Sequence, residues 1–134
     1  MKKILFVFLF SAFTLYAHES ELRLKGKHSF ASYHQCSHEA LHDSNGLREA
    51  FLTAIEASGA HTLSYTEHVF EDGAYTLVIL LSESHATLHT YPELKSCFVD
   101  LFTFGEHCKA QPFHHVLIEY LDPGLSNLNL IERS

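Results

Sequence analysis

The sequence contains no tryptophan, one methionine, three prolines and only nine lysine and arginine residues, against sixteen aspartates and glutamates. The formal net charge is −7. A nucleic-acid partner would require a basic face to displace counterions from phosphates, so we expect no nucleic acid as a partner. Hydrophobic residues make up 46% of the 134 positions, which is enough for one buried core and too many for a disordered chain.

Cysteine is also scarce, and three cysteines at positions 36, 97 and 108 cannot form a disulfide framework. Histidine is abundant by contrast, with twelve residues scattered along the chain. No two of them show the His-Glu-x-x-His arrangement, and no Cys-x-x-Cys pair accompanies them, so the sequence predicts no metal site.

The N-terminus differs in composition from the rest of the chain. Two lysines precede an apolar run over residues 4–13, and Ala17 supplies a small residue for cleavage. The run is too short for a stable membrane span, so residues 1–17 indicate a signal peptide preceding a single domain over 18–134. We expect a periplasmic or secreted protein if this leader is cleaved. The alternatives are an apolar anchor and a misassigned start codon, and the latter would make the protein cytoplasmic.

Apolar periodicity predicts several strands and two helices in this domain. One helix lies between Asp43 or Ser44 and Gly59, and a second follows Pro112 and ends at Asp122. The strands are predicted over residues 22–34, 61–70, 75–81, 85–91, 97–104 and 125–131. This order predicts an α+β fold, a two-layer α/β sandwich with a mostly antiparallel sheet and helices on one face.

Residues 81–93 form a predicted hairpin with a polar tip, reading Leu-Ser-Glu-Ser-His-Ala-Thr-Leu-His-Thr-Tyr-Pro-Glu. This stretch resembles the signature of prokaryotic S-adenosylmethionine decarboxylase proenzymes, in which Glu-Ser-His is followed by an alternating strand ending in His-Thr-aromatic-Pro-Glu. Residues 26–28, 58–60 and 98–105 are similar to other segments of that family. The resemblance covers residues 24–107.

The resemblance implies self-cleavage between Glu83 and Ser84, which would give chains 18–83 and 84–134. The Ser84 hydroxyl would attack the Glu83 carbonyl, β-elimination would cut the chain, and hydrolysis would leave a pyruvoyl group at the new N-terminus. This self-generated cofactor forms a Schiff base with the substrate amine and accepts electrons as CO2 leaves. His89 matches the family's processing histidine. Thr76 stands where a processing serine is usual; it keeps the hydroxyl but is stiffer about χ1.

The resemblance also assigns substrate contacts to Phe70, Tyr91 and Glu93. The two aromatic rings are suited to stacking on adenine, and the carboxylate is suited to a hydroxyl or ammonium group.

Phe104 departs from the family pattern, in which a cysteine follows Phe-Thr and donates the proton to the product carbon. A phenylalanine cannot donate a proton. Cys108, Glu106 and His107 have suitable chemistry to replace it. Strand alternation puts Cys97 on the opposite face from Phe104.

The hairpin geometry places Thr76 almost opposite His89, both roughly 15–25 Å from their own Ser84 at about 3.3 Å per residue. Neither residue could reach that serine. We therefore predict a homodimer in which each protomer processes its partner.

Three hypotheses follow for the function. The first is a decarboxylase of S-adenosylmethionine that feeds spermidine synthesis. The second is a pyruvoyl-dependent decarboxylase of another amino acid, such as ornithine or arginine. The third is an exported binding protein that has kept the fold and lost turnover.

Overall fold

Alternating apolar residues give the chain its antiparallel sheet, as the computed structural model of the protein shows for residues 25–134. The predicted leader over residues 1–17 lies outside this described part. The six strands are β1 (Gly26–His34), β2 (Thr62–Val69), β3 (Tyr75–Leu81), β4 (Ser84–Tyr91), β5 (Ser96–Thr103) and β6 (Leu125–Arg133). They lie in the order β2-β3-β4-β5-β1-β6, and each strand is antiparallel to its neighbours.

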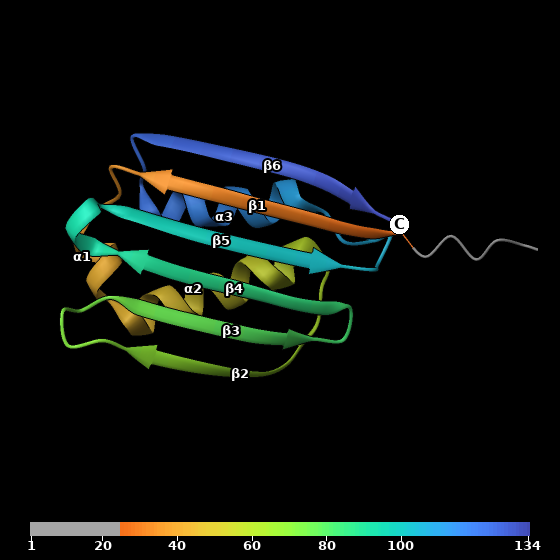
Figure 1. The fold of residues 1–134 in the computed structure, drawn as a ribbon, viewed down its shortest axis with the longest axis horizontal. Helices are drawn as coiled ribbons and strands as arrows, with labels where there is room; N and C mark the ends of the chain where they lie inside the picture. Colours follow the sequence, from red (N-terminus) through yellow and green to blue (C-terminus); the bar gives the residue numbers. More distant parts are fainter. Residues whose placement is uncertain (1–24) are drawn as a thin grey trace, which may run out of the picture.

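The helices are α1 (His38–His42), α2 (Ser44–Ser58) and α3 (Ala110–Leu121), with a 3₁₀ turn, η1, at Pro92–Leu94. They lie behind the sheet, which covers them in the view of Figure 1. Fully buried side chains from both layers meet between α2, α3 and the sheet, among them Tyr33, Phe51, Leu77, Leu88 and Phe113. The predicted two-layer α+β sandwich is therefore confirmed.

The opposite face of the sheet carries no helix in the described part of the chain (Figure 1). Residues paired across neighbouring strands share this face, including Thr76, His89 and Phe98 in one row. A second row joins Val78, Thr87 and Asp100. Several of its large apolar side chains are exposed, namely Val78, Leu80, Tyr91 and Phe98.

Within residues 25–134 the predicted strands agree with the structure to within a few residues, and the helices differ in two respects. Residues 22–24 of the first predicted strand lie outside the described part. The short helix α1 was not predicted, because five residues are too few to show a helical period. Helix α3 begins at Ala110, ahead of Pro112, and not after it. Proline is tolerated there because the N–H groups of a first turn have no partner within the helix.

Helix α2 begins and ends where its sequence predicts. The Asp43 side chain accepts a hydrogen bond from the Gly46 N–H at 2.9 Å, and Gly59 ends the helix with a φ of 87°. The left-handed turn at Gly59 leads the chain straight into β2.

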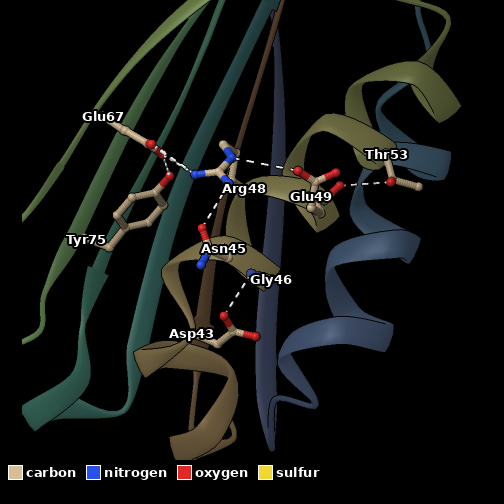
Figure 2. A network of polar contacts seen from close by, with 8 residues as sticks. All are labelled: Asp43, Asn45, Gly46, Arg48, Glu49, Thr53, Glu67 and Tyr75. Atoms are coloured by element: carbon tan, nitrogen blue, oxygen red, sulfur yellow. Dashed lines mark hydrogen bonds and ion pairs between the residues drawn. The ribbon is translucent and has the colours of Figure 1, made fainter.

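A polar network ties α2 to the sheet edge formed by β2 and β3 (Figure 2). Arg48 donates to both carboxylate oxygens of Glu67, at 2.9 and 3.1 Å, and to the Asn45 side chain at 2.9 Å. The buried Tyr75 hydroxyl donates to the same carboxylate. Hydrogen bonds from Tyr75 and Arg48 accordingly lower the pKa of Glu67. The β2–β3 hairpin, which bears Phe70 and Thr76, is held against the helix layer in this way.

Two further observations bear on the sequence-based expectations. No helix within residues 25–134 is both long and apolar enough to cross a membrane. Cys36, Cys97 and Cys108 are all buried and unpaired thiols.

Candidate active site

The Glu83–Ser84 peptide bond lies at the tip of the β3–β4 hairpin, where Ser84 is the first residue of β4 and pairs with Thr103 of β5. The Ser84 hydroxyl lies 3.1 Å from the Nδ1 atom of His85. The Phe104 N–H donates to the Glu83 carbonyl oxygen at 3.1 Å. A backbone donor is thus aimed at the oxygen that would gain negative charge if Ser84 attacked this carbonyl.

The Glu83 side chain has its own hydrogen-bond partners, which differ from the partner of the Glu83 backbone carbonyl. Its carboxylate accepts hydrogen bonds from the His61 N–H at 2.9 Å and from the His61 ring at 2.8 Å, and the His107 Nε2 atom lies 3.5 Å away. Burial raises the pKa of this carboxyl, but hydrogen bonds from His61 and Ser82 outweigh that effect and bring it to about 2. Glu83 is therefore ionised at neutral pH.

Thr76 and His89 face each other across β3 and β4, as the hairpin geometry predicts. The Thr76 hydroxyl lies 3.1 Å from the His89 Nδ1 atom. His89 is five residues along β4 from Ser84, a separation of about 16 Å at about 3.3 Å per residue. The structure therefore brings the two predicted processing groups together and keeps them away from the serine of the same chain.

The predicted substrate contacts gather around the same pair. A cavity of about 400 Å³ is lined by Phe70, Tyr91 and Glu93 together with Thr76 and His89. Phe70 and Tyr91 are 47% and 44% exposed, so neither packs in the core. All the predicted site residues except Glu83 and Ser84 thus share one hollow at the far end of the hairpin.

Comparison with known proteins assigns the chain to a family. The sequence profile described as S-adenosylmethionine decarboxylase matches residues 27–134. The chain belongs to this family. It is 34% identical over 108 residues to the S-adenosylmethionine decarboxylase proenzyme of Methanococcus maripaludis, covering 81% of this chain and 88% of that relative. It is 40% identical over 81 residues to the proenzyme of Prochlorococcus marinus, covering 60% of this chain and 65% of that relative.

A solved structure is similar over most of the fold. The adenosylmethionine decarboxylase from Aquifex aeolicus superimposes with a TM-score of 0.74 at 27% identity, covering 81% of this chain and 90% of that chain. The S-adenosylmethionine decarboxylase family is pyruvoyl-dependent and generates the group by self-cleavage. The position of Ser84 is compatible with self-cleavage. Ser84 is only partly buried at the start of its strand, and the carbonyl before it already accepts a hydrogen bond from the Phe104 N–H.

Phe104, at the position where the resemblance predicts a cysteine, follows the end of β5 and is 45% exposed. Its ring packs edge-on against Phe102, with centroids 5.0 Å apart. The chain after it folds back, and the Cys108 N–H donates to the Gly105 carbonyl at 3.1 Å. Burial and the nearby Glu83 carboxylate raise the pKa of the Cys108 thiol, which keeps it protonated.

Of the three residues with suitable chemistry to replace the missing cysteine, two lie near the cleavage site. Cys108 is beside Thr103 and His107 is beside Glu83. The Glu106 carbonyl accepts a hydrogen bond from Lys27, and nothing brings its carboxylate to the serine. Cys97 is fully buried in the core, in line with its predicted face.

His61 and the Phe104 N–H were not predicted from the sequence. His61 is 22 residues from Glu83, and no local motif links the two positions. The position of the Phe104 N–H depends on where β5 ends relative to the hairpin tip. Side-chain patterns in the sequence do not predict that position.

The charge on Glu83 predicts a specific pH dependence of stability. Its folded pKa of about 2 is below the value of about 4.3 for an unpaired glutamate, so the ionised form stabilises the fold above about pH 4.3 and loses this effect as the pH falls towards 2. We expect Glu83→Gln to lower the free energy of unfolding at about pH 6, and this deficit to fall by about half at about pH 3. Urea denaturation at both pH values, in a Ser84→Ala background that stays uncut, measures this difference in the free energy of unfolding.

Glu119→Gln is the matched control, because Glu119 pairs with His115 on the exposed surface of α3 at 3.2 Å. That substitution should change the free energy of unfolding little at either pH. A Glu83→Gln deficit that is the same at both pH values would contradict the proposed role of the charge.

Proposed function

We propose that this protein is a self-cleaving, pyruvoyl-dependent carboxy-lyase that decarboxylates S-adenosylmethionine. The observation that carries the proposal is the Glu83–Ser84 bond at a hairpin tip, with its carbonyl hydrogen-bonded to the Phe104 N–H. Membership of a family whose relatives are S-adenosylmethionine decarboxylase proenzymes supports the substrate. Neither another amino acid nor a purely binding role is favoured by these relatives.

Processing would begin when the Ser84 oxygen attacks the Glu83 carbonyl carbon and the amide is converted to an ester. The Phe104 N–H stabilises the negative charge on the carbonyl oxygen during this step. A base, for which we propose His89, removes the Cα proton of Ser84. The ester bond then breaks, and Glu83 leaves with a free carboxylate. Water adds to the remaining residue and ammonia departs, which leaves the pyruvoyl group.

When formed, the pyruvoyl ketone binds the substrate amine and accepts the electron pair released with CO2. The residues of the 400 Å³ cavity would position the rest of the substrate. Phe70 and Tyr91 present exposed aromatic faces for the adenine ring, and Glu93 offers a carboxylate to a hydroxyl or ammonium group.

The site would be completed by a second copy of the chain. Ser84 and the Thr76–His89 pair lie at opposite ends of one hairpin, so they can meet only between protomers. The Thr76–His89 pair lies on the sheet face that carries no helix in the described part of the chain, and this face exposes Val78, Leu80 and Phe98. Two such faces packed about a two-fold axis would bury these side chains and place each Ser84 over the partner's cavity.

Intact-mass spectrometry and CO2 release test the function together. We expect two chains, one ending at Glu83 and one starting at a blocked residue 84, and CO2 from S-adenosylmethionine in preference to ornithine or arginine. The first mass also reports whether residues 1–17 have been removed. A chain that stays whole on prolonged incubation would refute pyruvoyl chemistry, and preference for another amine would refute the substrate.

Processing between protomers predicts rescue in a mixture of two inactive variants. A Ser84→Ala chain keeps His89, and a His89→Ala chain keeps Ser84. Co-expressed, they should form heterodimers in which the His89→Ala chain is cut, although neither variant is cut efficiently alone. Mass spectrometry identifies which chain has been cleaved.

The matched control replaces the first partner with a Ser84→Ala, His89→Ala double variant, which offers the same surface without the base. No cleavage should then occur above the level of His89→Ala alone. Equal cleavage with both partners, or none with either, would contradict processing between protomers.

The absence of a thiol at position 104 predicts a defect in turnover and not in maturation. Without a donor at this position, protonation at the wrong carbon should inactivate the enzyme by transamination. Phe104→Cys should therefore raise kcat and slow inactivation during turnover, while the extent of self-cleavage stays the same. Phe104→Ser is the control, because it opens the same space without a thiol. An equal gain from both substitutions, or no gain in a fully processed enzyme, would count against this account.

A further inference from the structure

Two histidines converge on the Glu83 carboxylate from separate parts of the chain. His61 comes from the segment between α2 and β2, and His107 from the loop between β5 and α3. One nitrogen of each ring and one Glu83 oxygen all lie within 4.8 Å of one another. The catalytic proposal uses the backbone of Glu83 and assigns no ligand to these three side chains.

The ligand set matches that of a divalent d-block cation. Two imidazoles and one carboxylate form the protein ligands of many zinc sites, and a fourth position is left for water. Bonds of about 2.0–2.2 Å in tetrahedral geometry separate neighbouring ligand atoms by about 3.3 Å. The distances from the Glu83 oxygen to His61 and His107 are 2.8 and 3.5 Å, and the two ring nitrogens lie within 4.8 Å of each other, so the rings would have to move by up to about 1.5 Å to reach that spacing.

The two rings have room to make these movements. The His61 and His107 side chains are 74% and 58% exposed, whereas Glu83 is only 10% exposed. A side chain on Gly105 would begin 2.6 Å from the His107 ring, so glycine leaves that space clear. Rotation of either imidazole towards the carboxylate would therefore displace water and not core packing.

The backbone around the cluster is held in place. The Ser82 N–H donates to the His61 carbonyl at 3.0 Å, and the Lys109 N–H donates to the Ser58 carbonyl at 2.9 Å. The Lys27 ammonium donates to the Glu106 carbonyl at 3.2 Å. These bonds fix both flanks of the cluster before any ion arrives, which lowers the entropy cost of binding.

We propose that His61, Glu83 and His107 bind one divalent d-block cation of the Zn²⁺ class beside the self-cleaving bond. Even without bonding to the reacting atoms, the ion would link the segment between α2 and β2, the hairpin tip and the loop over residues 104–109.

Zinc binding to an untagged, metal-stripped full chain tests this proposal. A Ser84→Ala background keeps the chain uncut, so the result is independent of cleavage and of decarboxylation. Isothermal titration with Zn²⁺ should show one equivalent, and Co²⁺ in the same site should show the visible absorption of a tetrahedral centre. His61→Gln and His107→Gln should each weaken binding by about 100-fold or more, since even outer partners of metal ligands are worth about 10–100-fold.

Two control variants address the other histidines. His115→Gln removes an exposed histidine that pairs with the single carboxylate of Glu119. His42→Gln removes a ring that stacks on His38 with centroids 4.2 Å apart. Both should leave Zn²⁺ affinity unchanged, and circular dichroism checks that every variant folds. Absence of stoichiometric binding, or an affinity that falls with the control variants and not with His61→Gln or His107→Gln, would overturn the proposal.

Discussion

A β-strand cannot fold back on itself, and this constraint governs the proposed site. Ser84 and His89 occupy one strand, β4, so the five residue steps from one to the other keep the two about 16 Å apart. The register of β3 and β4 then places Thr76 beside His89 and away from Ser84. An enzyme that needs all three groups together has to obtain them from two chains. The sheet face that carries Thr76 and His89 has no helix on it in the described part of the chain and exposes apolar side chains, and we propose that two chains pair on this surface.

Glu83 has its backbone and its side chain held by different parts of the fold. Its carbonyl accepts the N–H of Phe104, and its carboxylate accepts two hydrogen bonds from His61. These contacts come from opposite sides of the hairpin tip, so together they restrict rotation of the Glu83–Ser84 peptide. A peptide held in one orientation, with a donor already on its carbonyl, starts closer to the geometry that attack by Ser84 requires.

The sequence predicted those features that depend on local patterns. Period-two alternation located the strands, and Asp43 and Gly59 marked the ends of α2. The position of the turn near Glu83 was enough to place Thr76 opposite His89, because a hairpin's turn determines its register. What escaped prediction depends on tertiary contacts. β6 pairs with β1 across the whole chain, and His61 reaches Glu83 only because α2 ends beside the hairpin tip.

Position 104 shows how maturation and turnover could diverge in one family. The Phe104 N–H, which binds the Glu83 carbonyl, belongs to the main chain and would be present with any residue except proline. The proton donor expected from the family pattern, by contrast, is a side-chain thiol. The benzyl side chain of phenylalanine has no such donor. The nearest buried thiol, Cys108, remains protonated but lies beside Thr103, whose side chain is buried beneath the helix layer. A phenylalanine at this position therefore leaves the contact proposed for self-cleavage in place and changes only the group proposed for catalysis, so maturation and turnover depend on different atoms of the same residue.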